Sequence, residues 1–290
     1  MSSFRLVMLS DTHVSRTHPF FFHNWEVALE AANALSPDIA LICGDVTFNG
    51  PDVADDLTFG AEQIARLSAP VIRTVPGNHD VGYSPATVSM RQLMTPGRRD
   101  AWIDSFGADF WSLDHGDWRF VGLNPFLFES GQDAEAEQEA MLTDALTGHD
   151  RPVGVFLHVP PFAHDPAETD EATTGTLRPA ARKRLLDICT GAGSVRFMAS
   201  GHLHRDKRMR FHDIEFIWAP GTAFMSSGPR SAAWGGEPWV GFLDFRFDGD
   251  RYTVEKVEPQ DMLNIDLRNW ARGEAHRYFD IAGQPFRTAR

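Results

Sequence analysis

Short runs of apolar residues alternate with amphipathic segments along most of the chain. The apolar runs are typical of strands that are buried on both faces. In the first amphipathic segment, Asn24 is a predicted N-cap, and apolar residues recur at helical spacing until Pro37 ends the helix. The predicted strands are 4–10, 39–43, 71–75, 153–157, 195–199 and 214–218, and further helices are predicted at 52–68, 133–146 and 178–189.

Two other stretches predict antiparallel hairpins. Residues 110–113 return as 118–123, and residues 240–247 return as 252–257, each across a turn that contains Gly and Asp. Strands that alternate with helices predict an α/β fold, to which these hairpins add antiparallel strands. Residues 161–176, rich in Ala, Thr, Asp and Pro, predict a long loop over a functional feature.

Composition and charge exclude some classes of function for this chain. The chain is 42% hydrophobic and 23% charged, which is typical of a soluble globular protein. Its net charge of −13 repels a polyphosphate backbone, so we expect no general nucleic-acid binding. We find no apolar stretch near the ~18 residues of a membrane span and no signal-peptide core. We therefore expect a cytoplasmic protein without a membrane partner.

Polar residues of a few chemical kinds follow five of the predicted strands. Carboxyl ends of strands converge in open α/β sheets, so we expect these five loops to meet. In extended chain, residues two apart project to the same side, so Asp11 can face one site with His13, and His202 with His204. The strand-end residues are Asp11, His13, Asp45, Asn78, His79, Asp80, His158, His202 and His204.

Imidazole, carboxylate and amide oxygen are ligands of divalent transition metals. Seven candidates exceed what one ion takes, and Asp45 is the natural ligand to share between two ions, an arrangement known for phosphoryl chemistry. Taken alone, a segment such as Asn-His-Asp is commonly just a turn. An explanation by solvated polar residues must, however, account for all five loops and for 5 of the 12 histidines at strand ends.

The series Asp-x-His, Gly-Asp, Gly-Asn-His-Asp, His-x-Pro and Gly-His-x-His resembles that of the calcineurin-like metallophosphoesterase superfamily, over roughly residues 4–225. The compact layout resembles bacterial class III cyclic nucleotide phosphodiesterases and glycerophosphodiesterases. The resemblance implies a double β-sheet sandwich flanked by helices, a four-layer α/β/β/α fold, in residues 1–258. Residues 259–290 would be a C-terminal appendage. Val159 departs from the pattern, because many relatives carry a histidine there.

The resemblance also implies a role for each strand-end residue. His79 would be the catalytic residue that faces the phosphate, and Asp80 would support its loop. The cofactors would be two divalent ions of manganese, iron, zinc or cobalt. One ion would be held by Asp11, His13, Asp45 and His204, and the other by Asp45, Asn78, His158 and His202.

The implied function is hydrolysis of small phosphodiesters, such as cyclic nucleotides, by in-line attack of a metal-bridging hydroxide. Two ions, two carboxylates and this hydroxide sum to a charge of roughly +1, which suits a diester monoanion. A phosphomonoesterase, or less favourably a nuclease, of the same superfamily is the alternative. A non-catalytic scaffold should lack ligands, and none is missing. Assembly into a homo-oligomer is left open.

Overall fold

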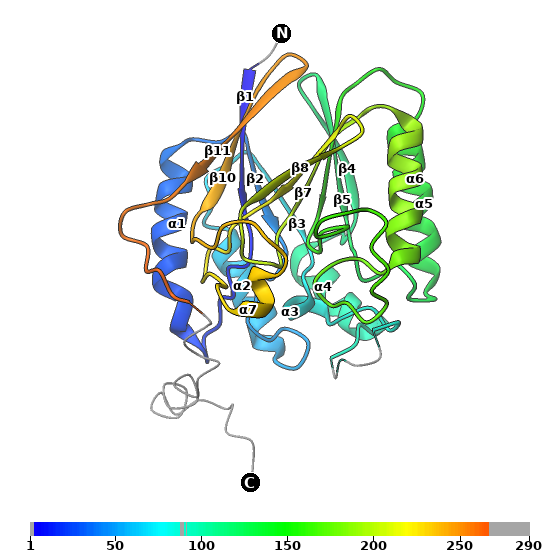
Figure 1. The fold of residues 1–290 in the computed structure, drawn as a ribbon. Helices are drawn as coiled ribbons and strands as arrows, with labels where there is room; N and C mark the ends of the chain where they lie inside the picture. The colour runs from blue at the N-terminus through cyan, green and yellow to red at the C-terminus, as the bar shows by residue number, and fades with distance from the viewer. Residues whose placement is uncertain (1–2, 88–89, 91, 267–290) are drawn as a thin grey trace.

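Two β-sheets lie face to face in the computed structural model of the chain, which describes residues 3–87, 90 and 92–266 (Figure 1). In each sheet the central strands are parallel and the flanking hairpins add antiparallel partners. The first sheet has the order β11 (Arg251–Val257), β10 (Phe242–Asp248), β1 (Ser3–Leu9), β2 (Ile39–Cys43), β3 (Val71–Val75). The second has the order β4 (Trp111–His115), β5 (Trp118–Leu123), β6 (Val153–Leu157), β7 (Val195–Ser200), β9 (Ile214–Trp218), β8 (Lys207–Phe211).

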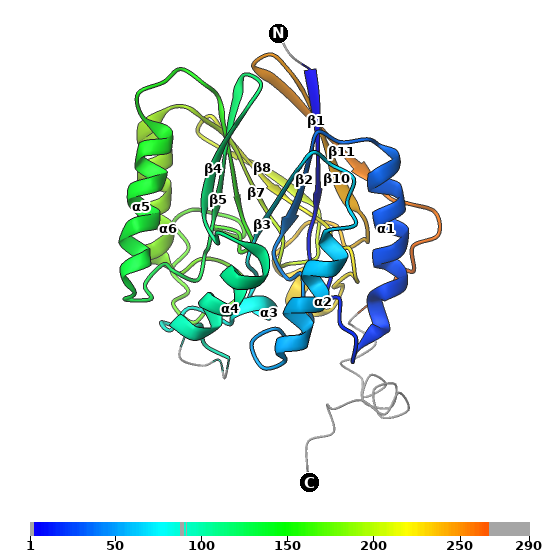
Figure 2. The ribbon, with the colours of Figure 1, turned by 180° about the vertical axis from the view of Figure 1, so that it is seen from behind.

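Helices cover the outer faces of both sheets (Figures 1 and 2). The first sheet is covered by α1 (Phe22–Ala34) and α2 (Ala54–Ile64), and the second by α5 (Asp133–Leu146) and α6 (Pro179–Ala192). The four-layer α/β/β/α fold is therefore confirmed. Four further elements of the described chain gather at the carboxyl ends of the parallel strands: η1 (Pro19–Phe21), α3 (Asn78–Val81), α4 (Pro96–Phe106) and α7 (Pro229–Ala232).

The alternation of side chains along the strands builds two apolar layers. On β1, Leu6 and Met8 pack between the sheets, whereas Val7 and Leu9 pack beneath the helices. Burial on both faces explains why such strands are continuous apolar runs in the sequence. Phenylalanines from both sheets fill the layer between them: Phe4, Phe120, Phe156, Phe197, Phe245 and Phe247.

Most predicted elements are present, with the following differences. Strand β8 was not predicted, because its sequence KRMRF alternates cationic and apolar residues at a sheet edge and lacks a continuous apolar run. Helix α4 and the short elements η1, α3 and α7 were also not predicted. Asn24 is not an N-cap: it lies inside α1, and its buried amide donates hydrogen bonds to the carbonyls of Ala223 and Leu263. The stretch 161–176 is a loop, as predicted.

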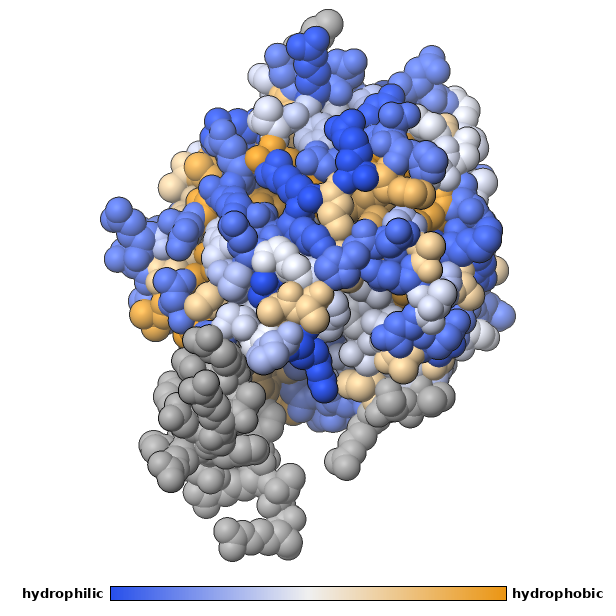
Figure 3. Space-filling model, in the orientation of Figure 1, coloured by the Kyte–Doolittle hydropathy of each residue, from blue (hydrophilic) through white to orange (hydrophobic). Residues whose placement is uncertain are grey.

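Polar residues dominate the face of the molecule in Figure 3, as the charged composition leads us to expect. No helix in the described part of the chain combines the length and the apolar character needed to cross a membrane. Residues 267–290 of the predicted appendage (259–290) lie outside the described residues. The domain division therefore stays a prediction.

Candidate metal centre

Five loops meet where the parallel strands of both sheets end. The first sheet contributes the residues that follow β1, β2 and β3, and the second contributes those that follow β6 and β7. The structure brings all seven candidate ligands to this region. Asp11, His13, Asp45, Asn78, His158 and His204 are buried, and His202 is partly buried.

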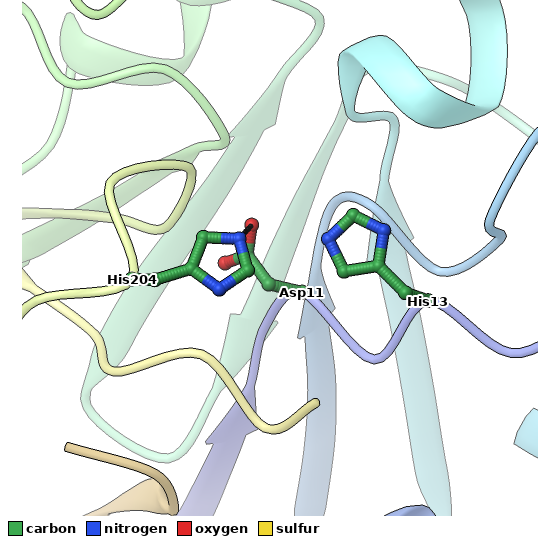
Figure 4. A group of neighbouring side chains, drawn as sticks. All are labelled: Asp11, His13 and His204. Atoms are coloured by element: carbon green, nitrogen blue, oxygen red, sulfur yellow. Dashed lines mark ion pairs between the residues drawn. The ribbon is translucent and has the colours of Figure 1, made fainter. Parts of the chain in front are cut away.

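The two carboxylates lie among the imidazoles. Asp11 Oδ1 is 3.1 Å from His204 Nε2 and 3.9 Å from His158 Nε2. Asp45 Oδ2 is 3.2 Å from His158 Nε2 and 3.7 Å from His13 Nε2. Figure 4 shows how Asp11, His13 and His204 come together from loops far apart in the sequence. Ligand atoms form three groups, each within 4.8 Å: Asp11 with His13 and His204, His13 with Asp45 and His79, and Asp45 with His158 and His202.

The backbone at these residues is not extended, contrary to the prediction for Asp11 with His13 and for His202 with His204. Five candidate ligands have positive φ, which is uncommon for residues other than glycine and clusters at functional sites. The amides of Asp11 and His13 donate to the carbonyls of Gly44 and Asp45, both at 3.0 Å. These bonds join the loop after β1 to the loop after β2. The φ values are 56° for Asp11, 44° for His13, 49° for Asp45, 69° for His202 and 51° for His204.

Glycines in the motifs let the loops approach this closely. Gly44 has φ +81°, and a Cβ there would lie 2.4 Å from the ring of His158. A Cβ on Gly77 would lie 2.1 Å from the backbone nitrogen of Asp45. Contacts this short exclude any side chain, so these glycines are required by the close approach of strand-end loops.

Backbone carbonyls orient three of the imidazoles. His158 Nδ1 donates to the carbonyl of Cys43 at 2.8 Å, and His204 Nδ1 donates to that of Phe224 at 2.8 Å. His202 Nε2 donates to the carbonyl of Thr174 at 2.7 Å. A carbonyl oxygen only accepts, so the bonded nitrogen carries a proton, and when the ring is neutral the other nitrogen presents a lone pair to an ion.

Several buried polar atoms have no hydrogen bond to any described residue. They are both ring nitrogens of His13, Nε2 of His158 and Oδ1 of Asn78. Buried polar atoms are normally paired, so these atoms need another partner. Imidazole nitrogen and amide oxygen beside two carboxylates are a donor set that fits divalent transition-metal ions.

The carboxylates and imidazoles of the centre change one another's pKa values. Burial opposes ionisation of Asp11, but the imidazoles of His204 and His158 lower the pKa of this carboxyl group. Burial likewise opposes ionisation of Asp45, whose pKa is lowered chiefly by His158. Burial favours neutral His158, yet these two carboxylates raise its pKa to about 9. Burial lowers the pKa of His202 to about 4. Ionised carboxylates thus face the centre, where cations would balance them.

The buried carboxylate of Asp80 joins two of the loops. Its carboxylate accepts hydrogen bonds from the amides of Val46 at 3.2 Å, Thr47 at 2.8 Å and Gly77 at 2.8 Å. These bonds tie the loop after β2 to the loop after β3. Burial, followed by the charge of Asp45, raises the pKa of Asp80 to about 7. This geometry agrees with the supporting position predicted for Asp80.

Two contributors to the centre were not identified from the sequence. The ring of Phe224 stacks on His204 and His13, with centroids 4.0 Å and 5.0 Å apart. Thr174 acts through its carbonyl, which any residue has, so its identity gives no signal. Its position inside the predicted loop 161–176 was the one indication available in the sequence.

Comparisons with known proteins agree with this geometry. The family model described as calcineurin-like phosphoesterase matches residues 4–206, well over half of the chain. No curated protein matches the chain.

Solved structures share the fold. A dimetal phosphatase from Danio rerio has a TM-score of 0.58 at 15% identity, with 87% of this chain and 95% of that chain covered. GAP50, the anchor in the inner membrane complex of Plasmodium, has a TM-score of 0.59 at 13% identity, with 95% of both covered. A purple acid phosphatase from yellow lupin (Lupinus luteus) seeds has a TM-score of 0.58 at 14% identity, with 91% of this chain and 53% of that chain covered.

Proposed function

The chain belongs to the calcineurin-like phosphoesterase family, and on this premise we propose that it is a phosphodiesterase for small phosphodiesters. The family uses a binuclear metal centre and is a family of hydrolases. When bound, two divalent ions would activate water as the nucleophile and stabilise charge on the phosphoryl oxygens. Cyclic nucleotides are among the candidate substrates.

The proposed ligand sets divide the centre between two ions. One ion takes Asp11, His13, Asp45 and His204, and the other takes Asp45, Asn78, His158 and His202. The observation that carries this proposal is the position of Asp45 Oδ2, within 4 Å of His13 from one set and of His158 from the other. A carboxylate so placed suits a ligand shared by both ions.

His79 is proposed as the residue that faces the substrate. Its Nδ1 donates to the carbonyl of Phe48 at 2.7 Å, which leaves Nε2 for other partners. One of its ring nitrogens lies within 4.8 Å of ligand atoms of His13 and Asp45. From there, Nε2 can stabilise a phosphoryl oxygen or deliver a proton to a departing alkoxide.

The test compares a matched pair of aryl substrates. Protein stripped by a chelator should not hydrolyse a nitrophenyl phosphodiester, and added manganese, zinc or cobalt should restore activity. We expect kcat/KM for the diester to exceed that for the nitrophenyl monoester, because a site charge near +1 matches a singly charged group. The reverse ranking would favour a phosphomonoesterase, and full activity without metal would exclude a two-ion centre.

A further inference from the structure

The last residues that the structure describes pack beside the candidate metal centre. After β11 the chain passes alongside α1 (Figures 1 and 2). In this segment Met262 is buried, and Ile265 packs against an apolar cluster that contains Phe224. We call residues 261–266 the strap and residues 219–228, which follow β9, the Phe224 loop. The strap therefore contacts the surroundings of the centre, although neither proposed ligand set includes any of its residues.

The Phe224 loop orients one of the candidate ligands. The carbonyl of Phe224 accepts from His204 Nδ1 at 2.8 Å, and the ring of Phe224 stacks on the imidazole. The packing is close, because a Cβ on Gly221 would lie 2.3 Å from His204 Nδ1 and 2.4 Å from the Phe224 oxygen. A displaced carbonyl would therefore turn the imidazole, whose Nε2 lies 3.1 Å from Asp11 Oδ1 (Figure 4).

The strap fixes the peptide group that carries this carbonyl. The amide of Met225 donates to the carbonyl of Ile265 at 2.8 Å. This amide and the carbonyl of Phe224 belong to one trans peptide group, which is planar, so its N–H and C=O point in opposite directions. A contact that fixes the N–H thus also fixes the C=O. Further along both segments, the hydroxyl of Ser227 donates to the carboxylate of Asp266.

Asn24 joins the strap to the Phe224 loop through a fully buried side chain. Its amide nitrogen donates to the carbonyl of Ala223 at 2.8 Å and to that of Leu263 at 2.9 Å. Its amide oxygen accepts from the backbone nitrogen of Leu263 at 2.7 Å. The side chain of Leu263 is 52% exposed, so Asn24 holds the strap by its backbone. One side chain of α1 therefore fixes both segments.

We infer that the strap is a positioning element of the candidate metal centre and that Asn24 is the positioning residue through which it holds His204. The inference rests on the proposed function and gives the first residues of the predicted appendage (259–290) a role at the site. The dependence should be confined to the ion proposed for His204. Histidines of the other ion are oriented by the carbonyls of Cys43 and Thr174, which lie outside both segments.

The test measures the two metal affinities separately, by calorimetric titration of metal-free, full-length protein with manganese. His204→Ala should lose one binding event and so identifies the event of its ion. Asn24→Ala should weaken this event about 10-fold, the lower end of the loss expected when a group that supports a metal ligand is removed, and should leave the other event unchanged. Ser227→Ala removes one contact of the strap without altering α1, and should weaken the same event by a smaller factor.

Gln138→Ala is the matched control. Gln138 is a fully buried amide on α5, and it bonds to the backbone nitrogen and carbonyl of Asn124 at 2.7 Å and 3.1 Å, as Asn24 bonds to those of Leu263. The variant should change neither binding event. Thermal unfolding shows whether each variant is folded.

Unchanged affinities in folded Asn24→Ala, or equal weakening of both events, would overturn the inference and leave the two-ion centre intact. The same selective loss in Gln138→Ala would also overturn it, because removal of any buried amide would then suffice. If Asn24→Ala does not fold, Ser227→Ala decides: selective weakening supports the inference, and unchanged affinities overturn it. Wild-type protein that binds no manganese would overturn both the inference and the proposed function.

Discussion

The two sheets contribute different chemistry to one centre. Loops of the first sheet carry the carboxylates and the amide, whereas loops of the second sheet carry imidazoles only, and His13 is the single imidazole from the first sheet among the candidate ligands. The first sheet therefore supplies the negative charge that attracts cations, and the second supplies directional nitrogen ligands. Each proposed ion takes ligands from both sheets, so bound ions would also link the ends of the two sheets.

The two sets of ligands are also held in different ways. In the first sheet, neighbouring loops brace each other, as in the bond from the amide of Asp11 to Gly44 and the hydrogen bonds that Asp80 accepts. In the second sheet, each imidazole is oriented by a single backbone carbonyl, such as that of Thr174 for His202 and that of Phe224 for His204. A change in the segment that supplies the carbonyl should therefore disturb the orientation of that imidazole.

The largest effect is expected at the point where the two sets share a ligand. Asp45→Ala should release both ions, because its Oδ2 lies beside a histidine of each set. Loss of a single stabilising group typically costs 10²–10³-fold in kcat, so loss of both ions should cost at least about 10⁴-fold.

Elemental analysis compares Asp45→Ala with His202→Ala, which should release one ion only. Two ions retained by Asp45→Ala would show that the carboxylate is not shared. Loss of both ions from His202→Ala would show that the second-sheet ligands do not serve a separate ion.

A large but selective effect is expected at His79, which adjoins the first-sheet ligands and belongs to neither proposed ligand set. General acid catalysis typically contributes about 10²–10⁴-fold and matters most for a poor leaving group. His79→Ala should keep both ions and lose about that factor on an alkyl diester, but far less on a nitrophenyl diester. Equal losses on both substrates would assign His79 to charge stabilisation. Loss of an ion would identify it as a ligand.

The sequence predicted the parallel strands and the strand-end residues because both depend on local pattern. Buried parallel strands are continuous apolar runs, and a rule of topology brings their carboxyl ends together. The sequence did not predict the left-handed backbone at Asp11 and Asp45, because that conformation follows from hydrogen bonds between loops. Thr174 was missed for the same reason, since its contact to His202 joins two separate segments.

Gly44 lies where the two sets of ligands meet, because it is on a first-sheet loop and touches a second-sheet ligand. Gly44→Ala should displace His158, since the new Cβ would lie 2.4 Å from its ring. We expect loss of the ion that His158 would hold and a decrease of about 10²-fold in activity. Gly148→Ala is the matched control, because Gly148 has a similar φ of +75° but no atom within 4 Å of the new Cβ. Each substitution should cost about 1–3 kcal/mol of stability from the backbone alone. Equal metal content in both variants would show that the contact with His158 is unimportant.

The smallest effect is expected at Arg182, which lies on α6 outside the centre and holds the loop that bears Thr174. The arginine side chain is 2% exposed, and its guanidinium donates to the carbonyl of Glu168. The carboxylate of Glu168 in turn accepts from three amides of the loop, those of Ala163, His164 and Asp165.

Loosening this loop should free the carbonyl of Thr174, so that His202 loses its orientation. Removing a group that orients a metal ligand typically costs 10–100-fold in metal affinity. Arg182→Gln acts one step further from the ligand, through the loop. We therefore expect about 10-fold weaker binding of the ion that His202 would hold and unchanged binding of the other ion. Calorimetric titration of metal-free protein with manganese measures the two affinities separately. Lys183→Gln is the control, because it removes an exposed ion pair with Asp187 from the same helix and should change neither. Equal weakening of both ions in Arg182→Gln would point to general destabilisation, and the dependence of His202 on the carbonyl of Thr174 would then be wrong.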